Sequence, residues 1–567
     1  MATSATAVSI GTLLNAAAKP IRVPRVQRPY SWEASETKEL WEDILEFYNR
    51  YPGDTIHSRE YFMGAIVGQE QEDTDGSFVE ILDGQQRLAT LTILLSVLRD
   101  RLEPADPKGA QSIQLSNIAK FVRLNTPSEF LLTLNKVDRS FFRQTIQEFP
   151  RSDHEERSAS HTLIRKARDY FDRKFVEHAE VEDISQADLA YRLHSVIATN
   201  LKVVFINSGS WDDASDVFER LNDRGKGLST LNLLRNHVLS KAPSHQLDDV
   251  EGFWEQVYSL SQSASKVDTF LRHVWITHRG DVKKQSLFKE IKAVMATPST
   301  PEALKDPYKF SSNLASDAEM YKEILASRHN DPGCARWLRA IQTMGATALL
   351  PAALASSDGW QDTASQMKLL RALVATFVRF SIIAGGDSSS LESAAYKVAY
   401  NVRSGCSLEE ALAILRPLLR TDEQVKEYFK TLSIPNAKSG YQRHILEELE
   451  NHASDATGDK TGGLEKSAAG SSVLWIEHIY PQSPGNHWSR WEKHDSLVNR
   501  IGNITLVHKK LNATASNKPF ATKKSIYADS GLALNRYLDG LDEWDPQQVE
   551  KRQNELASQV PLVWPAF

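Results

Sequence analysis

The spacing of hydrophobic residues along this chain changes near residue 240. Before that point, short runs of β-branched and aromatic residues predict strands at 21–24, 61–67, 78–82 and 201–207. A helix is predicted over 36–50, where apolar residues recur at helical spacing: Leu40, Trp41, Ile44, Leu45, Phe47 and Tyr48. The first part of the chain therefore mixes strands with helices.

From about residue 240 to residue 450 the pattern is almost wholly helical. Helical periodicity occurs at 250–263, 268–277, 316–327, 364–384, 408–419 and 439–450. The next stretch, 451–472, is small, polar and glycine-rich, which predicts a loop or linker. These patterns predict an α+β protein that is predominantly helical, with domains at 1–240, 241–450 and 451–567.

The composition is that of a globular protein that is too long for one ordinary core. The chain has 567 residues, of which 41% are hydrophobic and 25% are charged. The strongest candidate for a membrane span, 369–386, contains Arg371 and Arg379 and so predicts a buried helix instead. Two cysteines and an N-terminus without a signal-peptide pattern are consistent with a reducing cytoplasm and predict a cytoplasmic protein with no membrane partner.

The net charge of −6 means that any contact with nucleic acid must come from a local patch. Such a patch lies between residues 486 and 524, where basic residues outnumber Glu492 and Asp495. DNA binds surfaces of this kind through counterion release, without sequence reading. A solvated basic face is the alternative, and the overlap of the patch with the motif below favours DNA. The basic residues are Arg490, Lys493, Arg500, Lys509, Lys510, Lys518, Lys523 and Lys524.

The most informative motif is WIEHIYPQ at 475–482, followed after an interval by GNITLVHKKLN at 502–512. Glu477 offers a hard oxygen ligand, and His478 offers an imidazole that titrates near neutral pH. Cleavage of a phosphodiester needs a metal to neutralise charge on the phosphate and a base to activate water. Adjacent strand residues point to opposite faces, so the pair can act together only where the strand ends. Pro481 predicts such an ending.

Together these segments resemble an HNH (ββα-metal) nuclease, in the variant whose third motif residue is asparagine. That variant occurs in the C-terminal half of GmrSD-type restriction enzymes, and the SNKPF segment at 516–520 continues the GmrSD-type pattern. The resemblance implies that Glu477 and Asn512 bind Mg²⁺ or Mn²⁺. It also implies that His478 is the general base and that Asn503 braces the hairpin and the histidine. The residues expected to contact DNA are Lys509, Lys510, Lys518, Lys523 and Lys524.

The alternative for this segment is a glutamate–histidine pair beside a strand-ending proline, with Asn503 and Asn512 as ordinary turn residues. The spacing of the two asparagines, the GN-x-T-L segment and the surrounding lysines favour the nuclease interpretation.

A second cluster of polar residues lies at LDGQQR (82–87), between a predicted strand and the helix LATLTILLSVL. Gly84 permits a tight turn, and the free N–H groups of a helix N-terminus bind anions. Gln85, Gln86 and Arg87 add donors suited to phosphate oxygens. Two further blocks accompany it. One is the extended segment VPRVQRPYSWE at 23–33, and the other is 216–236, which is expected to hold a helix, a turn at 222–225 and the start of a second helix capped by Ser229.

These blocks resemble the GmrS-like N-terminal module of GmrSD-type proteins, whose core is ParB-like. The resemblance covers about residues 15–240 and 440–540, and it implies a ParB-like α/β module at 1–240 and an HNH nuclease domain at 451–567. The domain at 241–450 is matched only in being helical. The resemblance also implies NTP binding and hydrolysis coupled to recognition and cleavage of DNA. One departure is Val26, which stands where the family has an aromatic residue and puts in doubt what the pocket reads by stacking. The implied nucleotide-binding residues are Asp83, Gly84, Gln85, Gln86, Arg87, Gln27 and Arg28.

An alternative for this module makes Arg87 and Asp83 a buried ion pair, with Arg28 and Trp32 as core packing. The chain has no G-x-x-x-x-G-K-[ST] motif, which argues against a Walker-type ATPase.

The leading hypothesis is a type IV, modification-dependent restriction factor in antiphage defence, in which the N-terminal module senses modified DNA and the HNH module cuts. A modified phage base and a phosphorothioate linkage are both compatible with this architecture, as is a homo-oligomer. A second hypothesis keeps the nuclease but makes NTP binding, or a phage component, the switch. A third is a non-catalytic ParB-like DNA-binding regulator, against which the intact set Glu477, His478, Asn503 and Asn512 argues.

Overall fold

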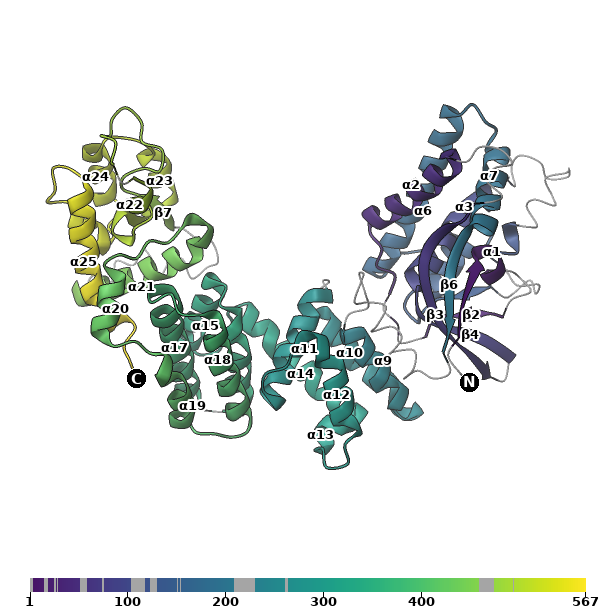
Figure 1. The fold of residues 1–567 in the computed structure, drawn as a ribbon, viewed down its shortest axis with the longest axis horizontal. Helices are drawn as coiled ribbons and strands as arrows, with labels where there is room; N and C mark the ends of the chain where they lie inside the picture. The colour runs from purple at the N-terminus through teal and green to yellow at the C-terminus, as the bar shows by residue number, and fades with distance from the viewer. Residues whose placement is uncertain are drawn as a thin grey trace. The chain divides into compact units, whose positions relative to one another are not determined.

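The structure is a computed structural model, shown in Figure 1, and it falls into two compact units. The first unit comprises Met1–Gly252 and Glu290–Lys309, and the second comprises Phe253–Lys289 and Phe310–Phe567. The division into three domains stays a prediction. The residues that the structure describes are 4–14, 19–24, 27, 29–50, 59–73, 76–102, 118–122, 130–149, 151–152, 154–208, 230–260, 264–360, 362–457, 474–492 and 494–567.

The first unit is built on a mixed six-stranded sheet with the order β1-β6-β3-β4-β2-β5. The strands β3 and β4 form an antiparallel hairpin, β1 runs antiparallel to β6, and the remaining neighbours are parallel. The four strands predicted in the sequence are present, and β1 and β5 join them at the two edges. The strands are β1 (Ser4–Ser9), β2 (Ile21–Arg22), β3 (Tyr61–Asp73), β4 (Gly76–Asp83), β5 (Leu132–Thr133) and β6 (Leu201–Asn207).

Helix α3 is the centre of this unit. Its residues are hydrophobic on nearly every side, so the helix is buried on nearly every side, and it packs against α6 and α7. The inward face of the sheet joins this core through residues such as Ile66 and Ile81. Their strand neighbours Val67 and Leu82 point to the opposite face and form a small separate cluster with Ile206. The helices are α1 (Ile10–Leu13), α2 (Ala34–Arg50), α3 (Gln85–Leu102), α5 (Arg139–Phe142), α6 (Ala159–Val181), α7 (Gln186–Ser195), α9 (Thr230–Lys241) and α13 (Glu302–Lys305).

In its described residues, the second unit is helical except for one two-stranded sheet. Several of its helices start at side-chain N-caps, as at Ser407, whose side chain forms a reciprocal capping box with Glu410. The helices α10 (Leu247–Ser259), α12 (Leu287–Ala296) and α14 (Pro307–Leu325) contain residues of both units. The others are α11 (Ala264–Arg279), α15 (Pro332–Met344), α16 (Leu350–Gly359), α17 (Thr363–Thr376), α18 (Ser388–Arg403), α19 (Leu408–Leu415), α20 (Asp422–Phe429), α21 (Ser439–Thr457), α22 (His494–Leu497), α23 (Lys509–Ala515), α24 (Phe520–Ala528) and α25 (Pro546–Val563).

The arginine-containing apolar stretch at 369–386 is a buried helix, as predicted. It forms α17 and continues as a π-helical turn over Phe377–Ile383. Arg379 is fully buried there and donates hydrogen bonds to Trp564 O at 2.8 Å and to Asp422 Oδ1 at 2.8 Å. In the described part of the chain, every helix is too short or too polar to cross a membrane.

The predicted linker at 451–472 begins too early. Helix α21 continues to Thr457, because the chain contains no glycine or proline between Asn451 and that residue. The rest of the predicted linker, from 458, lies outside the described residues.

The two-stranded sheet pairs β7 (Leu474–His478) antiparallel with β8 (Ile504–His508). The last helix, α25, supports it from the side. Arg552 donates to Gly502 O and to Ile504 O, both at 2.8 Å. The side chain of Gln553 accepts from Gly502 N at 3.0 Å and donates to Phe429 O at 2.6 Å. Gly502 is required at this contact, because a Cβ there would lie 2.4 Å from Val549 O.

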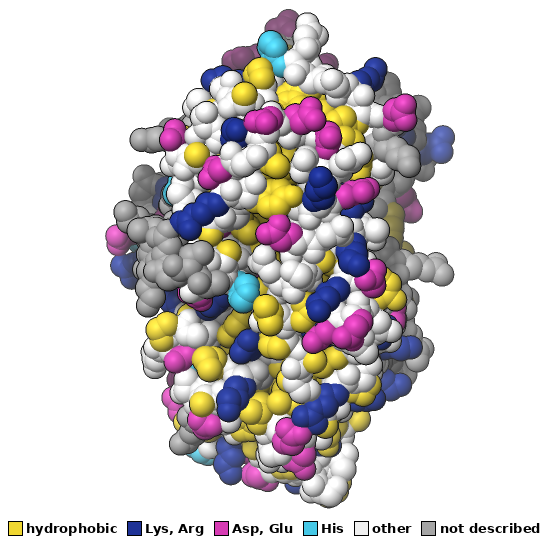
Figure 2. All heavy atoms as spheres, turned by 90° about the vertical axis from the view of Figure 1, so that its left-hand side faces the viewer, with side chains coloured by type: hydrophobic (Ala, Val, Ile, Leu, Met, Phe, Trp, Pro, Cys, Tyr) yellow, Lys and Arg dark blue, Asp and Glu magenta, His cyan; other side chains and the backbone are white. Residues whose placement is uncertain are grey.

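Acidic and basic side chains are interspersed over the face of the molecule seen in Figure 2, with apolar patches between them. This face carries no extended field of one sign, which agrees with the small net charge of the whole chain. A contact with DNA on this face would therefore rest on a few local side chains.

Candidate functional site

Strand β7 ends at His478, as the sequence predicts from Pro481. In the hairpin, Glu477 pairs with Thr505 and His478 pairs with Ile504. Strand β8 is buried on both faces from Ile504 to Val507, so the hairpin is fixed to the body of the unit through its second strand. The candidate residues lie at the end of the first strand.

Asn503 holds the chain that leaves β7. Its side chain is fully buried and makes four hydrogen bonds. Its Oδ1 accepts from Tyr480 N at 2.9 Å and from Trp544 Nε1 at 2.9 Å, and its Nδ2 donates to Tyr480 O at 3.1 Å and to Val498 O at 2.9 Å. Its main-chain oxygen also accepts from Ile479 N at 2.9 Å. These contacts are those of a residue that braces the hairpin, because every polar atom of the amide is used.

The ring of His478 is half-buried and is oriented by a different asparagine. Its Nε2 lies 3.2 Å from Oδ1 of Asn499, a residue that sequence reasoning missed. A proton on Nε2 donates to that oxygen, which leaves the lone pair of Nδ1 free to accept a proton. Burial lowers the pKa of His478, and the bond to Asn499 opposes this shift. The ring is therefore kept neutral near pH 7, the state that a general base requires.

Glu477 is held by a lysine that was predicted to contact DNA. The Nζ of Lys523 donates to Glu477 Oε1 at 2.7 Å, to His478 O at 2.7 Å and to Ile479 O at 3.1 Å. The side chain of Lys523 is 0% exposed, so it does not lie on the surface where a phosphate would bind. The prediction that Lys523 contacts DNA is therefore wrong. All three of its ammonium hydrogens are donated to acceptors within the protein.

The same carboxylate oxygen also receives the hydroxyl of Tyr527 at 3.4 Å. Burial raises the pKa of Glu477, and the ammonium of Lys523 limits the rise. Burial likewise raises the pKa of Tyr527 well above its ordinary value. Among the described contacts, both bonds to Glu477 are made to Oε1, which leaves Oε2 as a carboxylate oxygen for another partner.

Asn512 lies on α23, the helix that follows β8. Helix α23 packs against both strands of the hairpin, and the ammonium of Lys509 at its start lies 5.7 Å from the centre of the Trp475 ring. Lys509 and Asn512 are one turn apart on the helix, and Trp475 and Glu477 share one face of β7. The start of α23 therefore lies beside Trp475, and Asn512 lies one turn further along a helix that packs against both strands of the hairpin.

The amide oxygen of Asn512 is buried and has no hydrogen-bond partner among the described residues. A buried carbonyl oxygen without a partner is costly, and a cation is one partner that satisfies it. One carboxylate oxygen and one amide oxygen suit Mg²⁺, which takes oxygen ligands and keeps several waters. In the described residues no three His, Cys, Asp or Glu side chains come together in a group that could hold a metal ion. The donor set fits Mg²⁺ or Mn²⁺.

The remaining predicted DNA-binding lysines differ in their surroundings. Lys509 and Lys518 are exposed. Lys524 is half-buried and donates to Leu541 O at 2.7 Å. The side chain of Lys510 lies outside the described residues. The exposed cations beside the hairpin are thus fewer than the sequence suggested.

The second candidate site lies at the turn between β4 and α3 in the first unit. Gly84 has φ +90°, and a Cβ there would lie 2.8 Å from Cγ1 of Ile66, so only glycine fits. Gln27 is buried and donates to Leu82 O at 3.2 Å, while its Oε1 has no hydrogen-bond partner among the described residues. The structure thus places Gln27 beside the Gly84 turn, and its role in binding a nucleotide stays a prediction. Arg28 and the 222–225 turn lie outside the described residues.

Gln86 and Arg87 are used for internal contacts in this structure. Gln86 accepts from Ser31 N at 2.8 Å and donates to Pro29 O at 3.3 Å, which ties the start of α3 to the 29–31 segment. Arg87 donates to Ala65 O at 3.0 Å on β3. Burial lowers the pKa of Arg87, and the charge of Asp83 opposes the shift. Asp83 and Gln85 lie on either side of the Gly84 turn.

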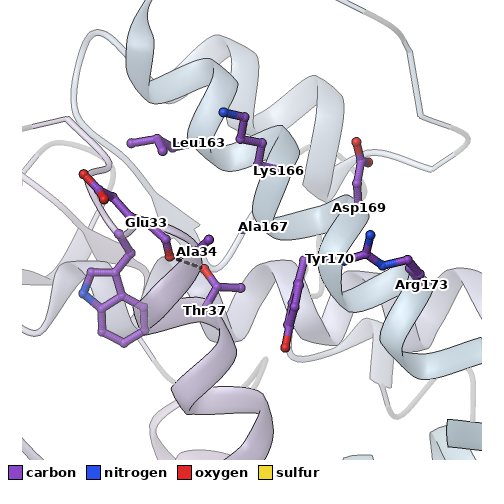
Figure 3. A pocket seen from close by; sticks show the side chains of 10 residues that line it. Glu33, Ala34, Thr37, Leu163, Lys166, Ala167, Asp169, Tyr170 and Arg173 are labelled. Carbon is purple, nitrogen blue, oxygen red and sulfur yellow. Dashed lines mark hydrogen bonds between the residues drawn. The ribbon is translucent and has the colours of Figure 1, made fainter. Parts of the chain in front are cut away.

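A groove of about 320 Å³ opens beside this segment, between α2 and α6 (Figure 3). Trp32, Tyr170 and Arg173 are among the side chains that line it. The predicted nucleotide-binding residues do not line this groove, so it is separate from the Gly84 turn.

Comparison with protein families connects the two candidate sites. The family model for the N-terminal domain of GmrSD restriction endonucleases matches residues 10–239. The family model for the C-terminal domain of GmrSD restriction endonucleases matches residues 419–559. The chain belongs to the GmrSD restriction endonuclease family. A comparison with curated proteins gave no match.

As a member of the GmrSD family, the protein is a restriction endonuclease, a defence enzyme whose substrate is DNA. The Gly84 turn lies within the first GmrSD match, and the hairpin with His478 lies within the second. Residues 240–418 lie outside both matches. In this segment the sequence shows helical periodicity and no functional motif.

Proposed function

We propose that this GmrSD protein is an HNH-type, metal-dependent DNA endonuclease whose cutting is controlled by an NTP-binding N-terminal module that senses modified DNA. The observation that carries the nuclease part is the buried amide oxygen of Asn512, which has no hydrogen-bond partner among the described residues and lies on the helix that packs against β7 and β8. This oxygen on α23, together with a histidine of lowered pKa at the end of β7, supports a site for one divalent cation and one activated water.

In this mechanism Glu477 and Asn512 would hold Mg²⁺ or Mn²⁺. The ion, when bound, neutralises charge on the scissile phosphate and on the departing oxygen. His478 takes a proton from the attacking water through the ring nitrogen that Asn499 leaves free. Lys523 keeps the carboxylate of Glu477 ionised and fixed in one orientation.

The control module is proposed at the Gly84 turn. The positive φ of Gly84 allows the tight turn that leads into α3, and the buried oxygen of Gln27, which has no partner among the described residues, offers an acceptor beside that turn. Arg87 and Asp83 supply a cation and an anion beside the turn. These features support binding of an NTP, and the resemblance to ParB-like modules supports its hydrolysis and the sensing of modified DNA.

The test is a plasmid-nicking assay with Mg²⁺, with and without NTP, on modified and unmodified plasmids. We expect His478→Ala to lower nicking by about 10²- to 10⁴-fold, the usual contribution of a general base, with NTP hydrolysis unchanged. Arg87→Ala should instead lower NTP turnover. His508→Ala, which removes a half-buried histidine at the far end of the same hairpin, is the matched control and should cut normally.

Unchanged nicking by His478→Ala would remove the histidine from its proposed role. Full NTP turnover by Arg87→Ala would remove the arginine from the nucleotide site. Equal cutting of modified and unmodified plasmids would contradict modification sensing while leaving the nuclease proposal intact.

A further inference from the structure

The Trp475 ring is unusually exposed for a tryptophan in this protein. It is 43% exposed, and among the tryptophans that the structure describes it alone is classed as exposed. Its strand neighbour Leu474 and its cross-strand partner Val507 are buried. A large aromatic side chain that is exposed to solvent while its neighbours are buried is accounted for when a partner binds there.

The surroundings of the ring are suited to a nucleic acid strand. The exposed ammonium of Lys509 lies 5.7 Å from the ring centre, in cation–π contact. Flat aromatic faces stack on bases and sugars, and lysines beside them neutralise phosphates. The pair thus offers two kinds of contact to one stretch of a DNA strand.

The position of the pair relates it to the proposed catalytic residues. Trp475 and Glu477 are two residues apart on one face of β7, where successive residues of a face lie roughly 7 Å apart. Lys509 and Asn512 are one turn apart on α23. If a DNA strand contacts Trp475 and Lys509, the phosphate about one nucleotide further along that strand lies near the proposed metal site at Glu477 and Asn512.

We propose that Trp475 and Lys509 form a DNA-strand contact that positions the strand for cleavage at the Glu477–Asn512 site. The proposal rests on the proposed function for the location of the cut, and on family membership for DNA as the partner. Trp475 acts as a positioning residue, because it holds the strand and does not touch the reacting atoms.

Binding is measured with the full-length protein in a His478→Ala background, so that cutting does not obscure the result. A labelled DNA oligonucleotide, duplex in one series and single-stranded in the other, is titrated by fluorescence anisotropy at several salt concentrations. We expect Trp475→Ala to weaken binding on the order of tenfold and Trp475→Phe to retain most of the affinity. Lys509→Gln should lower the slope of log affinity against log salt by about 0.9, and Trp475→Ala should leave that slope unchanged.

The matched control is Tyr428→Ala on α20, which removes an aromatic side chain that is 45% exposed in the same unit but away from the hairpin. Affinity equal in Trp475→Ala and in Tyr428→Ala would overturn the proposal. Thermal unfolding of each variant is measured to check that neither substitution destabilises the protein.

A second measurement separates this proposal from the nuclease assignment. With His478 intact, Trp475→Ala should raise the DNA concentration needed for half-maximal nicking and leave the maximal rate close to normal. A normal half-maximal concentration with a slow maximal rate would also overturn the positioning role. If His478→Ala still nicks, the catalytic assignment fails, whereas the binding result for Trp475 stands on its own.

Discussion

Replacing Lys523 by methionine tests whether one buried ammonium holds the candidate site together. The side chain is 0% exposed and donates three hydrogen bonds, to Glu477 Oε1 and to the main-chain oxygens of His478 and Ile479. Methionine has a similar length but carries no charge and no donor. The Lys523→Met variant therefore leaves a mostly buried carboxylate without its counterion and two carbonyl groups without a donor.

The size of the effect follows from these contacts. Removing one partner of a buried ion pair costs about 3–5 kcal/mol. The side chain of Glu477 is 12% exposed, so water reaches it and the lower end of the range applies. A local destabilisation of about 3 kcal/mol corresponds to an opening equilibrium larger by about two orders of magnitude.

Amide hydrogen exchange is the appropriate assay, because it reports local opening in a large protein that does not unfold in one step. Peptides covering 474–480 should exchange about 100-fold faster in Lys523→Met, whereas peptides of the first unit should not change. The matched control is Lys524→Met, since Lys524 is half-buried and donates only to Leu541 O among the described contacts. Adding Glu477→Gln to Lys523→Met should recover part of the loss, because the uncompensated charge is gone. Exchange in Lys523→Met equal to that in Lys524→Met would refute the reasoning.

Two further predictions concern buried polar groups. Asn503→Ala removes four hydrogen bonds from a fully buried amide and should destabilise the hairpin by about 3 kcal/mol, read as faster exchange over 476–482; an unchanged rate would contradict its bracing role. Burial lowers the pKa of His444 to about 4, so its contribution to stability is complete above pH 6.5 and is lost as pH falls from 6.5 toward 4. This loss approaches about 3 kcal/mol at pH 4, and His444→Gln should show a weaker fall of the thermal midpoint over that window; an equal fall in both proteins would contradict it.

The local signals in the sequence were reliable where the cause is local. Pro481 correctly marked the end of β7 at His478, and the helical spacing over 36–50 correctly predicted α2. The apolar stretch with Arg379 is a buried helix for the reason given, since a charged residue inside it needs protein partners. In each of these cases the deciding interaction involves neighbouring residues or the chain's own periodicity.

The signals failed where the partner is distant in sequence. Lysine is usually exposed, and nothing near Lys523 reveals that its acceptor is Glu477 on another element. The hydrogen bond that His478 donates to Asn499 depends on how the long loop between β7 and β8 folds back. Strand β1 is short and polar on one side, and it becomes a strand only because β6 offers it an edge.

The dependence of the hairpin on α25 has a consequence for synthesis. Arg552 and Gln553 lie in the last helix, and they satisfy the backbone at Gly502 and Ile504, where β8 begins. During translation the hairpin is made before these two side chains, so a nascent chain on the ribosome carries His478 on an unsupported scaffold. Truncated products that end before Pro546 should likewise be unable to cut the chromosome of the cell that makes them.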